Sequence, residues 1–143
     1  MDKLINEVEA EKEHISKTLA ALNKAIKREK TTIIELAAIA TFLQNAYNGI
    51  ENIIKRILKF KGISIPSSES WHKDLLDLSV SNKIITFELS NGLNEYRAFR
   101  HFFIHGYGIS LDKEKLMPLA KGLPLLWKDF ETEIKLFLTS LKV

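Results

Sequence analysis

Residues 32–58 read TIIELAAIATFLQNAYNGIENIIKRIL, and this stretch decides the fold class of the chain. Thr32 and Glu35 fit a capping box, in which the two side chains satisfy free N–H groups at the start of a helix. The apolar residues that follow cover a wide arc, and a helix with so wide an apolar surface usually lies at the centre of a bundle. The stretch therefore predicts a long central helix that stops at Gly62.

Before this stretch, the sequence predicts one amphipathic helix. Apolar residues recur at steps of three, four or seven from Leu4 to Ile26, with Glu and Lys on the other face. The helix ends in the cationic segment KREK (27–30), which suits the negative end of a helix dipole.

After it, three more helices are expected. The Gly-, Pro- and Ser-containing loop 62–70 precedes a short helix over 71–80 that Ser70 can cap. The segment SNKIITF has no evident partner strand and is interpreted as a loop that leads to a helix from about Phe87 to Ile104.

Asp112 is expected to cap the last helix, which contains two prolines. Pro118 can lie near its first turns, and Gly122 with Pro124 should bend it. Together these elements predict an all-α fold: an up-and-down bundle of four long helices plus a short helix, in a single domain over residues 1–143.

Composition sets limits on function. Hydrophobic residues make up 45% of the 143 residues and charged residues 27%, as in globular proteins. The net charge of +3 permits a nucleic-acid partner without requiring one, and the absence of cysteine excludes disulfides and thiolate chemistry. The N-terminus lacks the apolar core of a signal peptide, and no apolar run is long enough for a bilayer. We therefore expect a cytoplasmic protein without a membrane partner.

Residues 97–108, RAFRHFFIHGYG, combine arginines, histidines and phenylalanines at the end of the fourth expected helix. At about 100° per residue, Tyr96 and the phenylalanines fall on one side and are expected to anchor the helix. Arg97, Arg100, His101 and His105 fall toward the other side. Arg100 and His105 diverge by roughly 140° on an ideal helix, so they converge only if the helix loosens or if a second copy of the chain supplies one of them.

These residue types fit metal-independent cleavage of RNA. Histidine titrates near neutral pH and can transfer the proton of a 2′-hydroxyl or a leaving group, and arginine can stabilise the charge on a phosphate. The alternative is a solvated helix surface in which histidine favours the dipole. A metal site is not predicted, because His101 and His105 alone are an incomplete ligand set, and no cofactor is expected.

Three blocks of the sequence resemble HepT-like toxins of the HEPN superfamily. Arg100, His105 and Tyr107 spell the family's R-x4-H-x-Y signature within FRHFFIHGYGISLDKEKLMPL (99–119). TFLQNAYNGIENIIKRIL (41–58) resembles the family's Y-x-G-I-E helix, and IPSSESWHKDLL (65–76) resembles its P-x-x-x-x-W-H-x-x-L-L segment. The blocks follow in the family's order over roughly residues 30–120.

The resemblance implies a HEPN-like bundle that forms a two-fold homodimer with both R-x4-H motifs in one cleft. It implies a metal-independent endoribonuclease, the toxin of a type VII (HEPN/MNT) toxin–antitoxin system. Arg100 and His105 would be the catalytic pair, with His101 as an auxiliary residue. Tyr107 matches the tyrosine that the minimal nucleotidyltransferase (MNT) antitoxin modifies with AMP. A bulky anionic nucleotide there would repel RNA phosphates.

Further residues around the motif have more than one interpretation. Arg97, Lys55, Arg56 and Lys59 are candidates for RNA binding, although a charged helix end is often only a solvated face. Glu51 either faces Arg100 and the cleft or is a half-exposed surface carboxylate. The remaining assignments are structural, with Tyr47 and Trp71 in the core and His72 at a loop surface.

The leading hypothesis is therefore a homodimeric ribonuclease toxin that cleaves RNA. Structured RNA such as tRNA is the favoured target, because a rigid cleft selects by shape. Two alternatives stay open: a non-catalytic HEPN-type module that docks a nucleotidyltransferase or nucleotide, and a helical interaction protein.

Overall fold

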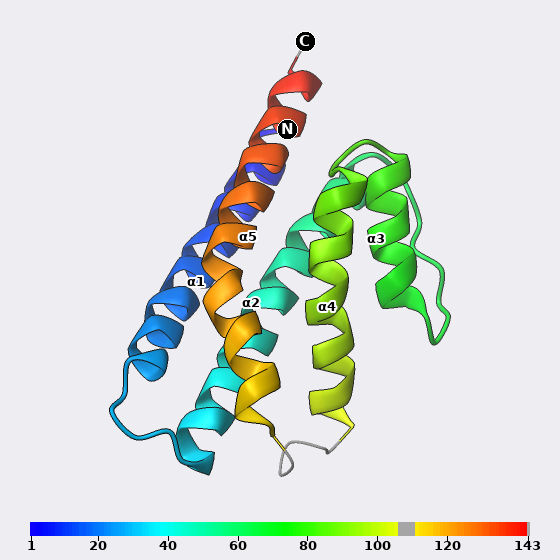
Figure 1. Cartoon of the computed structure of the whole chain (residues 1–143). Coiled ribbons are helices and arrows are strands. Elements are labelled where there is room, and N and C mark those ends of the chain that lie inside the picture. The colour runs from blue at the N-terminus through cyan, green and yellow to red at the C-terminus, as the bar shows by residue number, and fades with distance from the viewer. Residues whose placement is uncertain (106–110, 143) are drawn as a thin grey trace.

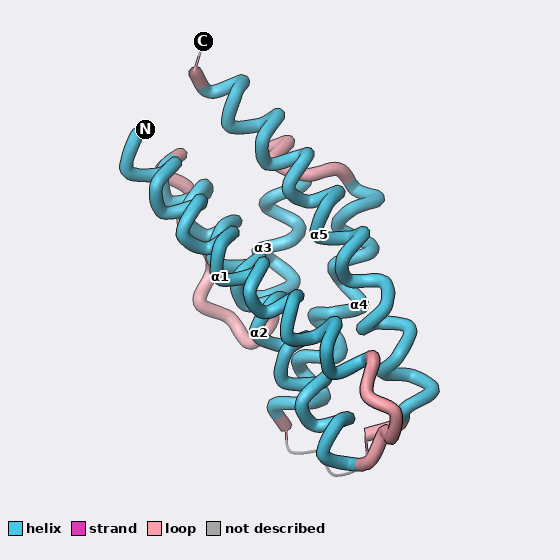
Figure 2. Tube along the Cα trace, turned by 90° about the vertical axis from the view of Figure 1, so that its left-hand side faces the viewer, coloured by secondary structure: helices cyan, strands magenta, loops and turns pink. Residues whose placement is uncertain are grey.

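In the computed structural model, residues 1–105 and 111–142 are described, and within them the chain forms five helices and no strand (Figures 1 and 2). In chain order the helices are α1 (Asp2–Ile26), α2 (Ile33–Phe60), α3 (Trp71–Ser81), α4 (Phe87–Ile104) and α5 (Lys113–Leu141). This confirms the predicted all-α bundle of four long helices and a short one. No described helix is both long and apolar enough to cross a membrane.

Helix α2 is the centre of the bundle, as its wide apolar arc predicts. It contacts each of the other four helices, and Figure 1 shows it passing behind α5 between the α1/α5 pair and the α3/α4 pair. Its buried residues surround most of the helix axis and are Leu36, Ile39, Ala40, Leu43, Ala46, Tyr47, Gly49, Ile50, Glu51, Ile53, Ile54, Ile57 and Leu58.

The start of α2 has the predicted capping box. The Thr32 hydroxyl accepts a hydrogen bond from the Ile34 N–H, and the Glu35 carboxylate accepts one from the Thr32 N–H at 2.8 Å. Side-chain acceptors at these positions satisfy donors that a helix leaves free in its first turn. The helix ends at Phe60, and Gly62 follows with a φ of +75°.

The other expected caps have different outcomes. The Asp112 carboxylate accepts from the Glu114 N–H at 2.9 Å, which confirms it as the cap of α5. Ser70 precedes α3, but the prediction that its side chain caps the helix is wrong. Its backbone is not extended there (φ −97°, ψ 20°), and its hydroxyl lies 3.4 Å from the Asp74 carboxylate instead.

Helix α5 continues through both of its prolines. Pro118 and Pro124 lie inside the helix, and Gly122 lies between them. In Figure 1 the yellow part of α5 runs at an angle to its orange and red part. This change of direction agrees with the bend expected where proline removes a backbone donor.

Gly49 allows α1 to approach α2 closely, on the turn of α2 that also carries Asn48 and Glu51. A Cβ atom at position 49 would lie 2.5 Å from Cγ1 of Ile15, which is itself fully buried. Because the Ile15 side chain has no free space to move into, the glycine sets the spacing between α1 and α2.

Replacing this glycine tests the close approach. Gly49→Ala is expected to lower the free energy of unfolding by about 1–3 kcal/mol, because overpacking forces the two helices apart. Gly122→Ala is the matched control: its Cβ would have its nearest contact at 3.4 Å, and alanine favours a helix by up to about 1 kcal/mol. Urea denaturation measures the free energy of unfolding of both variants. A Gly49→Ala variant that unfolds at the same urea concentration as wild type would contradict the packing argument.

Candidate functional site

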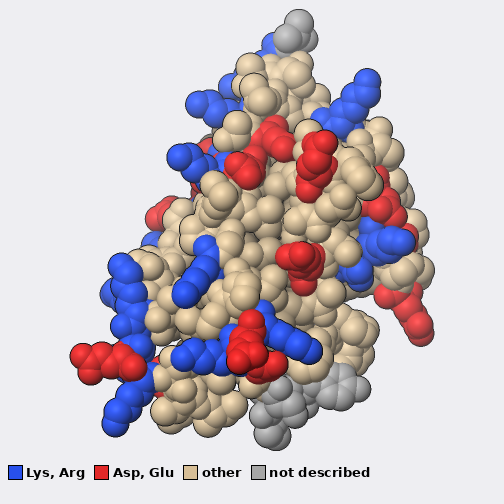
Figure 3. Space-filling view, in the orientation of Figure 1, with Lys and Arg blue, Asp and Glu red and all other residues tan. Residues whose placement is uncertain are grey.

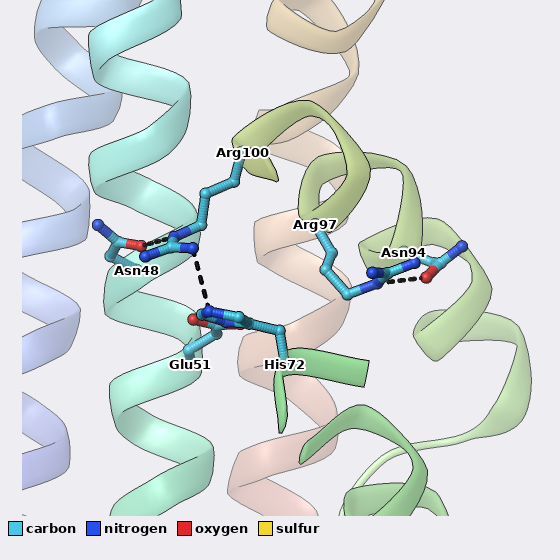
Figure 4. A network of polar contacts seen from close by, with 6 residues as sticks. All are labelled: Asn48, Glu51, His72, Asn94, Arg97 and Arg100. Carbon is cyan, nitrogen blue, oxygen red and sulfur yellow. Dashed lines mark hydrogen bonds and ion pairs between the residues drawn. The ribbon is translucent and has the colours of Figure 1, made fainter. Parts of the chain in front are cut away.

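Arg100 reaches from α4 to two other helices. Its Nε–H donates to Asn48 Oδ1 of α2 at 2.7 Å, and its Nη1 donates to His72 Nε2 of α3 at 3.1 Å (Figure 4). The side chain is half-buried. Because the guanidinium is held from two directions, both its position and its rotation are restricted.

The contact with Arg100 determines the tautomer of His72. An arginine nitrogen can only donate, so His72 Nε2 must accept and the ring proton must lie on Nδ1. Nδ1 in turn lies 2.8 Å from Glu51 Oε2, to which it donates. Asn48, Glu51, His72 and Arg100 form one chain of hydrogen bonds, here called the Arg100 network.

Glu51 is the most deeply placed member of the Arg100 network. It is 2% exposed, and its partner is the Nδ1–H of His72. A buried carboxylate is costly unless it is hydrogen-bonded. The sequence left the position of Glu51 open, and the structure places it in the interior, joined to Arg100 through His72.

Tyr47 lies one turn from Glu51 and is fully buried, which confirms it as a core residue. Its hydroxyl has no hydrogen-bond partner in the described residues. Burial raises the pKa of Tyr47 far above its usual value, and the charge of Glu51 raises it further. The phenol therefore stays protonated at physiological pH and cannot act as a general base.

A cleft lies beside the Arg100 network, between the loop before α3 and the second half of α4. Its volume is about 720 Å³. The aromatic and charged side chains that line it include Trp71, His72, Arg97, Arg100, His101 and His105. The structure thus brings four of the predicted site residues, Arg97, Arg100, His101 and His105, to one concave surface, here called the Arg100 cleft.

His101 and His105 form an exposed pair at this cleft. Their ring centroids are 4.2 Å apart, as expected for residues four apart on a helix. Helix α4 continues to Ile104, with His105 as its C-cap residue, so the helix does not loosen before His105. Arg100 turns toward α2 and α3 while His105 packs against His101, and the two predicted catalytic side chains line one cleft from different directions.

The predicted RNA-binding residues lie in different places. Arg97 lines the cleft and donates to Asn94 at 2.7 Å (Figure 4). Lys55 lies 4.2 Å above the ring of Trp71, next to the cleft. Lys59 is exposed near the end of α2. Tyr107 lies outside the described residues.

Arg56, by contrast, is engaged with α1. It pairs with Glu7 at 2.9 Å and with Glu11 at 3.5 Å. These contacts join α1 to α2, and Arg56 does not belong to the lining of the Arg100 cleft.

Three assignments from the sequence need correction or addition. His72 is not a loop surface group: it lies in the first turn of α3, and its ring joins Glu51 to Arg100. Phe102 is 39% exposed and lies outside the core, whereas Phe99 and Phe103 pack against the core. Asn48 is only the unspecified position of the Y-x-G-I-E motif, although its spacing of three from Glu51 places both on one face of α2.

Trp71 is half-buried and packs against the core, and its ring contacts both Lys55 and the ring of His72. The structure therefore confirms the tryptophan as a core anchor and also places it at the cleft. Figure 3 shows lysine and arginine mixed with acidic residues over the face that it displays. No single basic surface on that face marks a docking site, so the cleft is the better guide to function.

Residues 38–141 match the family described as HepT-like protein, which is most of the chain. The chain belongs to the HepT-like family. The match includes every member of the Arg100 network and confirms the resemblance found in the sequence. No curated protein matches the chain.

One solved structure supports the fold of this HepT-like protein. It is that of YutE from Bacillus subtilis, described as a cytosolic protein of unknown function. The two chains share 20% sequence identity and superpose with a TM-score of 0.65, over 90% of this chain and 91% of that one. At this identity the likeness supports the helical architecture.

The Arg100 network also predicts a difference between two arginines on α4. Arg100→Ala is expected to lower the free energy of unfolding by about 1–3 kcal/mol, because it leaves polar groups of Asn48 and His72 without a partner. Arg97→Ala should change it by less than about 0.5 kcal/mol, since within residues 1–105 and 111–142 Arg97 bonds only to Asn94 on its own helix. Chemical denaturation compares the two variants. Equal decreases in the free energy of unfolding would show that Arg100 does not join the helices.

Proposed function

We propose that this HepT-like protein is an endoribonuclease toxin that cleaves RNA without a metal ion at the Arg100 cleft. The observation that carries the proposal is the convergence of a fixed arginine and two exposed histidines on one concave surface. Arginine supplies a permanent charge for a phosphate, and histidine supplies proton transfer near neutral pH. No group of three or more His, Asp or Glu side chains suited to a metal ion occurs in the described residues.

In the proposed reaction the RNA supplies its own nucleophile. The 2′-oxygen attacks the adjacent phosphorus, and the bond between phosphorus and the 5′-oxygen of the next nucleotide breaks. His105 accepts and donates the protons of the reaction, and His101 beside it is the auxiliary group. The proton of the 2′-hydroxyl passes to the base, and a proton is delivered to the leaving 5′-oxygen. Arg100 stabilises the charge of the pentacoordinate intermediate, and the products are a 2′,3′-cyclic phosphate and a 5′-hydroxyl.

A two-fold homodimer would complete this site. Exposed apolar side chains lie on α4 directly beside the motif: Phe102 is 39% exposed and Ile104 is 46% exposed. Two copies packed along α4 would cover these side chains and bring the two clefts together. In this arrangement His105 of one copy could act with Arg100 of the other in a shared site.

The proposed substrate is structured RNA, with tRNA the favoured class. A cleft fixed by the Arg100 network selects a rigid backbone by its shape. Arg97 in the cleft and Lys55 next to it would contact the flanking phosphates.

An RNA cleavage assay in EDTA tests the activity. Wild type should cleave tRNA, whereas His105→Ala should be slower by about 10²–10⁴-fold and Arg100→Ala by about 10²–10³-fold, because proton transfer and charge stabilisation are lost. His14→Ala is the matched control, since His14 is exposed on α1, away from the cleft. Loss of wild-type activity in EDTA would refute the metal-independent mechanism.

The proposal includes neutralisation by an MNT nucleotidyltransferase antitoxin that transfers AMP to Tyr107. Two of the chain's three tyrosines, Tyr47 and Tyr96, are buried, which favours Tyr107 as the acceptor. The phenolic oxygen would attack the α-phosphorus of ATP, lose its proton and release pyrophosphate. The attached phosphate would repel RNA from the cleft, whose lining includes His105, a near neighbour of Tyr107 in the sequence.

Coexpression with a nucleotidyltransferase encoded beside the gene tests this step. Intact mass spectrometry should show one or more added adenylyl groups on wild type, and peptide mapping should place them on Tyr107. Tyr107→Phe should stay unmodified and keep its toxicity. An inactivated complex that contains unmodified Tyr107 would contradict the mechanism.

The engagement of Arg100 with Asn48 and His72 also fits a second candidate, a non-catalytic HEPN-type module that docks a nucleotidyltransferase or a nucleotide. In that case purified protein would bind its partner, and neither wild type nor the variants would cleave RNA.

A further inference from the structure

We propose that His72 is a positioning residue of the catalytic site: oriented by the buried Glu51, it fixes the Arg100 guanidinium for contact with the phosphate in the cleft. The inference rests on the proposed ribonuclease function. It assigns a role to the W-H segment and to Glu51, neither of which takes part in the proton transfers.

Arginine needs such support because its side chain is long. Fixing a free arginine in one geometry costs side-chain entropy. Here Asn48 holds Nε and His72 holds Nη1, from two different helices. No further hydrogen bond of the guanidinium occurs in the described part of the chain, and its other N–H groups can donate to an anion in the cleft that Arg100 lines.

A neutral histidine suits this contact better than a carboxylate would. A carboxylate bonded directly to Arg100 would compensate its charge before the substrate arrives. In the Arg100 network the negative charge of Glu51 does not contact Arg100 directly, because the ring of His72 lies between the two charges. Arg100 is thus held firmly while its charge remains directed to a phosphate.

Glu51 and Trp71 fix the state of the His72 ring. Glu51 accepts from Nδ1–H and so favours the tautomer whose Nε2 can accept from Arg100. The ring of Trp71 lies 3.6 Å from that of His72, centroid to centroid, and limits its rotation. Helix α3, the smallest helix of the bundle, therefore contributes to the site through its first two residues.

Two variants of His72 separate positioning from simple packing. His72→Phe keeps an aromatic ring but removes the acceptor. His72→Gln keeps an amide oxygen near the place of Nε2. We expect His72→Phe to lower kcat by about 10–100-fold with KM within about threefold of wild type, because the interaction acts in the transition state. His72→Gln should retain most of the activity. If instead both variants melt at the wild-type temperature and cleave RNA like wild type, the inference is wrong.

A double-mutant cycle shows whether His72 acts through Arg100. In an Arg100→Ala background, His72→Phe should cause no further loss of kcat, since the group it positions is gone. Losses that multiply in the double variant would overturn the inference. Such losses would mean that His72→Phe lowers kcat by disturbing the packing of the protein and not through Arg100.

Nuclear magnetic resonance tests the contact without relying on catalysis. In wild type the ¹⁵N signals of His72 should be those of a neutral ring protonated at Nδ1, and the Arg100 Nη1–H that donates to His72 should exchange slowly with water. In His72→Phe the Arg100 signal should exchange rapidly, and in His72→Gln it should stay protected. A His72 ring protonated at Nε2, or an Arg100 signal unchanged in His72→Phe, would refute the positioning role. If wild type shows these signals but does not cleave RNA, the ribonuclease proposal fails, and with it the catalytic part of the inference.

Discussion

The burial of Glu51 in α2 is the constraint on which the site depends. At 2% exposure, a carboxylate strongly favours a hydrogen-bond partner, because leaving a buried polar group unpaired costs a large part of the free energy that stabilises a small protein. His72 supplies that partner from α3, and the second nitrogen of its ring then accepts from Arg100 on α4. One buried side chain thereby specifies the relative placement of three helices and the direction of the arginine.

The packing on the opposite side of α2 has a complementary role. Gly49 admits Ile15 of α1 at a distance that no other residue would allow, and Arg56 joins the same two helices through Glu7 and Glu11. Helix α2 is held rigidly against α1, so the residues on its other face are held as well. The membership of this chain in the HepT-like family and its likeness to the fold of YutE agree with this helical architecture.

Most of the fold could be predicted from the sequence, because each feature that predicts it involves residues close together in the chain. The capping box at Thr32, the cap at Asp112 and the wide apolar arc of α2 act within one helix or one turn. Ser70 failed as a cap because its hydroxyl bonds to the Asp74 side chain rather than to the helix backbone. Phe102 failed as an anchor because a helical wheel does not reveal how much of an apolar arc the neighbouring helices cover.

For the candidate site, the sequence by itself determined which chemical groups are present and on which helix they lie. It placed Arg100, His101 and His105 on the last turns of one helix, and the spacing of four brings the two histidines together in any helix. Only the tertiary structure decided that Arg100 turns to Asn48 and His72, and that Glu51 lies behind them. The physical reason is that these contacts join residues 21 to 52 positions apart, and periodicity carries no information on which faces of different helices meet.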